Sequence, residues 1–175
     1  MGKIGLIGIL SKTRNVMCSR AYMYINHIFK RYKLDIRERM VFDPIRQKYV
    51  AFTPEEKIRQ QTIKFLMQRA KIPANKIGVE KTLHQLGDVG NRKRVDICIF
   101  DEADLPIAVI ECKADYIGNR EAPYVQALDY VRSLNVRNYF VVDGYALYGF
   151  HYNKTQIQFE PLAQVPRYEE LLRLK

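Results

Sequence analysis

Apolar and polar residues alternate along the chain in a way that predicts short strands interrupted by helices. From Lys33 onward, the expected strands cover residues 38–42, 48–52, 77–83, 95–100, 107–113, 137–142, 146–152 and 157–159. Helices are expected at 121–134 and 166–173, and a longer one begins at Thr53-Pro54 and ends before Ile72-Pro73. Because helix, strands, helix and strands follow in this order, we expect one α/β domain with a central mixed sheet flanked by helices.

The first long helix has a clear start signal and one apolar face. Thr53 is a good N-cap, Pro54 fits the first helical position, and Glu56 is placed to complete a capping box. On a helical wheel, Glu55 lies nearer the apolar face than Glu56, so Glu55 is the first choice for a carboxylate that reaches the sheet. Glu56 is the alternative. The apolar face is expected to carry Ile58, Phe65, Leu66 and Ala70.

Residues 1–22 do not share this pattern. They alternate apolar and basic patches without a clear period, and a second methionine, Met23, stands where the regular pattern begins. We therefore expect an amino-terminal basic extension at 1–22 and a single domain at 23–175. The intact mass of protein expressed from its native upstream region tests whether translation starts at Met23, and a dominant product beginning at Met1 would exclude this.

Two of the expected strands carry charges where a buried strand should carry none. Asp96 interrupts the strand at 95–100, and Glu111 and Lys113 interrupt the strand at 107–113. A symmetric antiparallel hairpin pairs residues whose numbers sum to 207, which places Asp96 opposite Glu111. Lys113 lies two residues beyond Glu111 and so points to the same face. The register therefore predicts two carboxylates and one ammonium group on one side of one hairpin.

Two carboxylates this close repel each other unless a cation lies between them. Hard oxygen ligands with room for water and phosphate suit Mg²⁺ or Mn²⁺. With Lys113 to orient a water molecule or to stabilise developing negative charge, the group indicates metal-dependent cleavage of phosphodiester bonds. The alternative is a purely structural ion pair of Lys113 with Glu111 or Asp96 at a sheet edge.

The net charge indicates a polyanionic partner, but most of this net charge lies in residues 1–48. The chain has 29 Lys and Arg against 19 Asp and Glu, a net charge of +10. Residues 1–48 hold eleven basic and three acidic side chains, a net of +8, which leaves only +2 for the other 127 residues. The positive charge is therefore concentrated away from the charged hairpin, and solvation alone could account for it.

Cysteine and apolar content indicate a reducing compartment and no membrane span. Cys18, Cys98 and Cys112 form no CxxC or Cys/His pattern, and two of them fall inside expected strands. They are expected to be small buried hydrophobes in the cytoplasm. No segment approaches the ~20 apolar residues of a membrane helix.

Further candidates stand close to the charged hairpin. Gln126 and Tyr130 are spaced i and i+4 on the expected second helix, so they share a face that could point at the hairpin and help to hold nucleic acid. Arg94 shares a strand face with Asp96 and is a candidate phosphate contact. Glu80 is a charge in another expected strand, and it is either a supporting carboxylate or an edge-strand residue.

In combination these residues suggest a family. Asp96, Glu111-Cys-Lys113 and Gln126-x-x-x-Tyr130 resemble the PD-(D/E)xK nucleases that carry an added Gln-x-x-x-Tyr motif. More closely, Thr53–Gln60, Arg94-Val-Asp96 and Val109–Lys113 resemble small proteins related to the amino-terminal nuclease domain of type I restriction endonuclease R subunits. The resemblance covers roughly residues 38–160, and Val95 stands where the named motif has proline.

The resemblance implies a restriction-endonuclease-like core with a site for DNA cleavage. Asp96 and Glu111 would be metal ligands for Mg²⁺ or Mn²⁺, and Lys113 would assist the attacking water. Glu55 or Glu56 would complete the site, and Gln126 and Tyr130 would belong to a motif tied to nuclease or translocation function. We expect an endonuclease rather than an exonuclease, with DNA as the partner.

The chain lacks the motor that type I R subunits couple to their nuclease. No Gly-x-x-x-x-Gly-Lys-[Ser/Thr] loop for ATP phosphates occurs in it. It would therefore act alone, act with another protein such as a restriction or repair subunit, or be a remnant of a larger enzyme. The alternative function is a DNA-binding or partner-docking module that keeps the fold and cleaves little.

Overall fold

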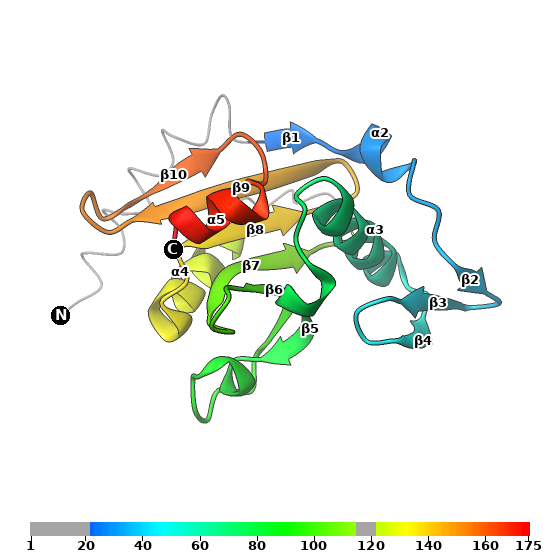
Figure 1. Ribbon diagram of the computed structural model, residues 1–175, viewed down its shortest axis with the longest axis horizontal. Helices are drawn as coiled ribbons and strands as arrows, with labels where there is room; N and C mark the ends of the chain where they lie inside the picture. The colour runs from blue at the N-terminus through cyan, green and yellow to red at the C-terminus, as the bar shows by residue number, and fades with distance from the viewer. Residues whose placement is uncertain (1–21, 115–121) are drawn as a thin grey trace.

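The computed structural model describes residues 22–114 and 122–175, which form a layered α/β fold (Figure 1). The strands are β1 (Tyr22–Tyr24), β2 (Ile36–Arg37), β3 (Met40–Asp43), β4 (Lys48–Ala51), β5 (Ile77–Thr82), β6 (Arg94–Phe100), β7 (Pro106–Cys112), β8 (Asn138–Val142), β9 (Ala146–Asn153) and β10 (Gln158–Leu162). The helices are α2 (Asn26–Phe29), α3 (Pro54–Gln68), α4 (Ala122–Leu134) and α5 (Tyr168–Arg173), with short 3₁₀ turns η1 (Ala74–Lys76) and η2 (His84–Leu86).

The strands form two sheets of unequal size. A seven-stranded sheet has the order β1-β9-β8-β7-β6-β5, with β10 also paired to β9, and a three-stranded sheet has the order β2-β3-β4. The large sheet is mixed, because β7 and β8 run parallel while β6 and β7 run antiparallel. A parallel pair needs a crossover connection, and α4 provides it between β7 and β8. The expected α/β class with a central mixed sheet flanked by helices is confirmed.

Each face of the large sheet has its own apolar core. Alternate strand residues point to opposite faces, so Ile110 packs with Leu66 of α3 on one side. Its neighbour Val109 packs with Tyr130 and Leu134 of α4 on the other side. The helices therefore cover opposite faces of the sheet, and β6 and β7 lie between them. Asp96 and Glu111 on these strands are thus placed between two helices, whereas Arg94 at the start of β6 is exposed.

The element pattern read from the sequence is largely confirmed. The hairpin around Asp43-Pro44, the helix after Thr53 and the strands and helices from residue 77 onward are all present. The expected apolar face of α3, made of Ile58, Phe65, Leu66 and Ala70, is buried. The sequence did not indicate β1, which pairs with β9, nor the single turn of α2.

Some expectations fall on residues that the structure does not describe. The expected extension at 1–22, including Cys18, lies outside the described residues except for Tyr22, which pairs with Tyr148 in the large sheet. Cys98 and Cys112 are free and buried, as expected. Among the described residues, no helix is both long enough and apolar enough to span a membrane.

Candidate active site

The β6–β7 hairpin has the register that the spacing of its charges predicted. Ile97 lies opposite Ile110, and the sum of 207 continues along the hairpin until an irregularity beside Phe100, near the turn. Asp96 and Glu111 occupy the next position on each strand, at the end away from the turn. Asp96 and Glu111 are therefore neighbours along the hairpin at the point where the ladder ends. Asp96 bonds to α3 and Glu111 to α4, which cover opposite faces of the sheet, so the structure does not show the single shared face that the register predicted.

Asp96 links the hairpin to α3. Its Oδ1 accepts a hydrogen bond from Arg59 Nη2 at 2.8 Å, and its Oδ2 accepts one from the backbone nitrogen of Cys112 at 2.7 Å. The second bond takes the place of a backbone ladder bond between β6 and β7. Because one oxygen is held by a helix and the other by a strand, the carboxylate is fixed in position.

Glu111 links the same hairpin to α4. Its Oε1 accepts a hydrogen bond from the Tyr130 hydroxyl at 2.6 Å, and its Oε2 lies 3.4 Å from Lys113 Nζ. Gln126 Nε2 in turn donates to the Tyr130 hydroxyl oxygen at 2.8 Å. The structure thus brings together the Glu-x-Lys and Gln-x-x-x-Tyr residues, and it confirms that Lys113 and Glu111 share a face.

Burial makes the charge on Glu111 costly. Its side chain is only 4% exposed. Burial raises the pKa of Glu111 to about 7, and the negative charge of Asp96 adds to the shift, while Tyr130 and Lys113 oppose it. Burial and the Glu111 carboxylate also raise the pKa of Tyr130, so this hydroxyl remains a donor at neutral pH. The negative charge of Glu111 is therefore incompletely balanced by the groups around it.

The first turn of α3 corrects one expectation. The helical wheel favoured Glu55 as the inward carboxylate, but Glu56 is the buried one, at 5% exposure, and the Glu55 side chain is 47% exposed. Thr53 accepts the expected hydrogen bond from the backbone nitrogen of Glu56, yet its own backbone nitrogen donates to Ala51, so Glu56 does not complete a capping box. The side chain of Glu56 points inward because two arginines bind it there.

Three donors surround the buried Glu56 carboxylate. Arg46 Nη2 donates to Oε1 at 2.6 Å and Gln60 Nε2 donates to the same oxygen at 2.8 Å, while Arg59 Nη1 donates to Oε2. Glu55 Oε1 lies 3.1 Å from Arg59 Nη2, the same nitrogen that holds Asp96. Both glutamates are therefore connected to Asp96 through Arg59.

Glu80 extends this network to the sheet edge. It lies in the edge strand β5, at the position that the register aligns with Asp96, and its φ of 50° is in the left-handed region. Its Oε2 accepts from Arg46 Nη1 at 2.5 Å, and its Oε1 lies 3.8 Å from both Arg59 and Arg94. Both interpretations of Glu80 hold, since it is an edge-strand residue and it supports the charged cluster.

Sequence reasoning missed Arg59 and Arg46. Arg59 is 4% exposed and stands on the buried face of α3, next to Ile58 and Gln60. A signal was present, because an arginine spaced i+4 from Glu55 and i+3 from Glu56 can pair with either. Arg46 gave no such signal, since its partners come from three different elements. Arg94, expected near phosphate, has a side chain that is 63% exposed.

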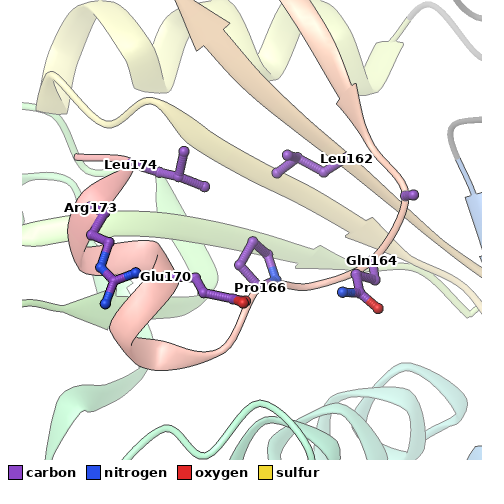
Figure 2. A pocket seen from close by; sticks show the side chains of 7 residues that line it. Leu162, Gln164, Pro166, Glu170, Arg173 and Leu174 are labelled. Atoms are coloured by element: carbon purple, nitrogen blue, oxygen red, sulfur yellow. The ribbon is translucent and has the colours of Figure 1, made fainter.

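A hollow elsewhere in the structure contains none of the candidate residues. It lies between the end of β10, the following loop and α5, as Figure 2 shows, with a volume of about 360 Å³. Leucine and proline side chains line it together with Glu170 and Arg173. Among the described residues, no group of three or more His, Cys, Asp or Glu side chains is arranged to hold a metal ion.

Comparison with known proteins assigns the family. The sequence model of the type I restriction enzyme R protein N terminus (HSDR_N) matches residues 54–166, which is more than half of the chain and includes every candidate residue named above from Glu55 to Tyr130. The chain belongs to this family, as the motifs indicated. No curated protein matches the chain.

One solved structure is similar over part of its length. It is the fragment structure of a putative HsdR subunit of a type I restriction enzyme from Vibrio vulnificus YJ016, at 22% sequence identity and a TM-score of 0.39. The similarity covers 56% of this chain and 20% of that one. The matched region is therefore about one fifth of the length of that fragment.

Proposed function

We propose that this chain is a metal-dependent nuclease domain that hydrolyses phosphodiester bonds of DNA, with endonuclease action. The observation that supports this most is that Asp96 and Glu111 take adjacent positions at one end of the β6–β7 hairpin, where the charge of Asp96 adds to the raised pKa of Glu111 and Lys113 lies 3.4 Å from Glu111. A buried carboxylate whose pKa is raised by burial and by a neighbouring carboxylate is the arrangement expected of a site that binds a cation.

The residues present fit Mg²⁺ or Mn²⁺. Asp96 and Glu111 supply hard carboxylate oxygens, and a divalent cation beside them would favour the charged form of Glu111. Such an ion is commonly held by one or two carboxylates, with water and phosphate oxygens completing the set. When bound, it supplies a more acidic water molecule and charge neutralisation at the phosphate.

The remaining residues have roles that follow from their contacts. Lys113, whose side chain is 41% exposed, can reach substrate while its ammonium group stays near Glu111, so it is suited to orient water or to stabilise the phosphate in the transition state. Tyr130 holds Glu111 in one orientation, and Gln126 holds Tyr130. These two are positioning residues, because they act through Glu111.

The second candidate function is a DNA-binding or partner-docking module of the same fold. The observation that favours it is the donor set of the carboxylates themselves. Arg59 already neutralises Asp96, and each oxygen of Asp96 and Glu111 has a protein donor or an ammonium group near it. A cluster whose carboxylates all have donors could serve to hold α3 and α4 against the sheet.

A cleavage assay separates the two functions. Supercoiled plasmid and single-stranded DNA are incubated with the protein and Mg²⁺ or Mn²⁺, with EDTA as the blank. The nuclease nicks closed circular plasmid, and Asp96→Ala and Lys113→Ala abolish nicking. The matched controls Asp104→Ala and Lys154→Ala remove the same charges from exposed turns and keep full activity. Cleavage that survives in EDTA, or in the site variants, rules out the mechanism. DNA binding without cleavage by any form supports the docking module.

A further inference from the structure

The segment between β5 and β6 (residues 83–93) is a short arm held by its own backbone. Leu83 N donates to Lys93 O at 2.8 Å, and His84 N donates to Asn91 O at 2.9 Å. The arm therefore continues the β5–β6 ladder beyond the sheet. Because its hydrogen bonds are internal, it has a defined shape without help from the rest of the fold.

A cavity lies along one side of this arm. Its volume is about 690 Å³. It is close to β6, and its lining combines strand ends with the arm. The residues that line it are Thr82, His84, Gly90, Arg92 and Arg94.

The polar side chains of this lining use acceptor atoms in bonds within the arm, so what they offer to the cavity is mainly hydrogen-bond donors. The hydroxyl oxygen of Thr82 accepts from Gln85 N at 3.2 Å, which leaves its hydrogen available. His84 Nδ1 accepts from Gly90 N at 3.2 Å, so the neutral ring carries its proton on Nε2. Arginine side chains can only donate. A cavity whose side chains can all donate is suited to an anion.

The charge of the arm and of the strand ends beside it agrees with this. Residues 81–94 contain four cationic side chains against one carboxylate, that of Asp88, although Glu80 lies 3.8 Å from Arg94 and Asp129 lies 3.2 Å from Lys93. Asp88 is engaged at the tip, where it accepts from Asn91 Nδ2 at 2.8 Å. The cations are Lys81, Arg92, Lys93 and Arg94. This contrasts with the rest of residues 49–175, which hold 14 basic and 15 acidic side chains.

The cavity lies beside the candidate active site. Arg94 stands two residues before Asp96 on β6, which is on the order of 7 Å along the strand. A polyanionic strand that passes the end of the β6–β7 hairpin would therefore meet the arm next. A small anion cannot extend from the hairpin to the arm, so the position of the cavity favours a polymer of phosphates.

We propose that the arm at 83–93 is a backbone clamp for nucleic acid, in which Thr82, His84, Arg92 and Arg94 hold a phosphodiester group of the DNA strand next to the one at Asp96 and Glu111. The ligand class is the sugar–phosphate backbone, without base recognition, because the cavity offers donors for phosphate oxygens. This inference rests on the proposed function for its choice of DNA as the ligand.

Binding without cleavage tests the clamp. Fluorescence anisotropy of a labelled duplex and a labelled single strand is measured in EDTA over a series of salt concentrations. The double variant Arg92→Gln/Arg94→Gln is expected to bind at least tenfold more weakly, with a salt slope smaller by about two, since each lost phosphate contact removes about 0.9. The control Lys154→Gln/Arg173→Gln removes the same charge from exposed positions and keeps the parent slope. Thermal unfolding verifies that both double variants fold.

Each outcome has a separate meaning. Unchanged affinity and slope in the Arg92/Arg94 variant overturn the clamp, even if the parent protein cleaves DNA. If that variant loses binding while no form of the protein cleaves DNA, the clamp stands and the nuclease proposal fails. If the variant binds as weakly as expected but the control pair weakens binding equally, the effect is one of net charge and the clamp is overturned.

Discussion

Arg59 Nη2 donates to Asp96 Oδ1 at 2.8 Å. A buried arginine from the first long helix therefore binds the carboxylate that the sequence predicts to be a metal ligand. Burial by itself would lower the pKa of Arg59, but the charge and hydrogen bond of Asp96 raise it. The guanidinium therefore stays charged and cannot release Asp96 by losing a proton. A cation at this carboxylate must compete with Arg59 or share the oxygens with it.

Removing this arginine should weaken the folded state in a way that a divalent cation corrects. Arg59→Ala takes from the partly buried Asp96 the arginine bound to it and leaves the buried Glu56 with one of its two arginines, Arg46, at a cost of about 3–5 kcal/mol. Urea unfolding in EDTA measures this loss. Adding Mg²⁺ or Mn²⁺ is expected to stabilise the variant more than the parent. The exposed Arg37→Ala should change the free energy of unfolding by less than about 0.5 kcal/mol. An equal effect of metal on both proteins would contradict competition at Asp96.

The raised pKa of Glu111 predicts a pH dependence of stability in metal-free protein. Between its ordinary value of 4.5 and about 7, the folded protein holds a proton on Glu111 that the unfolded chain has released. The free energy of unfolding must therefore fall as pH rises through this window. Urea unfolding in EDTA at a series of pH values measures the slope.

Two variants test whether Glu111 causes this dependence of the free energy of unfolding on pH. Glu111→Gln removes the titration and is expected to flatten the dependence. Tyr130→Phe removes a hydrogen bond that lowers the pKa of Glu111, so its window should extend to higher pH. If Glu111→Gln keeps the slope of the parent, another group is responsible.

Substitutions of the two glutamates of α3 should have different effects on stability and on cleavage. Glu56→Gln loses charge-assisted bonds with Arg46 and Arg59 in a buried setting, and it is expected to destabilise the fold by about 2 kcal/mol or more. Glu55→Gln is half-exposed and should stay within about 0.5 kcal/mol of the parent. If Glu55 assists the metal, its variant lowers cleavage without lowering stability. A Glu55 variant with full activity would leave Glu56 as the only helix carboxylate in that role.

Gly149 should be intolerant of any side chain. A Cβ there would lie 2.8 and 2.9 Å from ring atoms of Phe140, in the middle of the β8–β9 pair. Gly149→Ala must displace a fully buried ring and is expected to cost about 1–3 kcal/mol. At Gly144 the nearest atom to an added methyl group is 3.7 Å away, on Ile58, so Gly144→Ala is the matched control. Equal melting temperatures for the two variants would show that Phe140 can move aside freely.

The hairpin that carries the site could be predicted because its information is local. Strand period and turn position together fix the register that pairs Ile97 with Ile110, which leaves Asp96 and Glu111 at the next position on each strand. The i, i+4 spacing of Gln126 and Tyr130 also placed them on one face, and the structure brings that face to Glu111. Where the relevant contacts are a few residues apart, the sequence contains what is needed.

The contacts of Arg46 could not be predicted because most of them are long-range, whereas the spacing of Arg59 from Glu55 and Glu56 gave a signal that the helical wheel does not use. Arg46 reaches Asp43, Glu56 and Glu80 at once, and nothing in the spacing of these residues indicates that their elements meet. The error over Glu55 has the same origin. A helical wheel ranks positions by their apolar neighbours, whereas Arg46 and Arg59 draw Glu56 inward by its charge. Two ion pairs, one tertiary and one within the helix, thus override local amphipathicity.

The pairing of β1 with β9 has a consequence for how the chain is made. Tyr24 lies beside Ala146 in the finished sheet, so the first described strand leaves the ribosome long before its partner exists. Contacts this distant in sequence form late and slow folding. Until β9 is synthesised and docked, the Tyr22–Tyr24 segment has no sheet to join. The nascent chain would need to keep this segment from other partners for most of its synthesis.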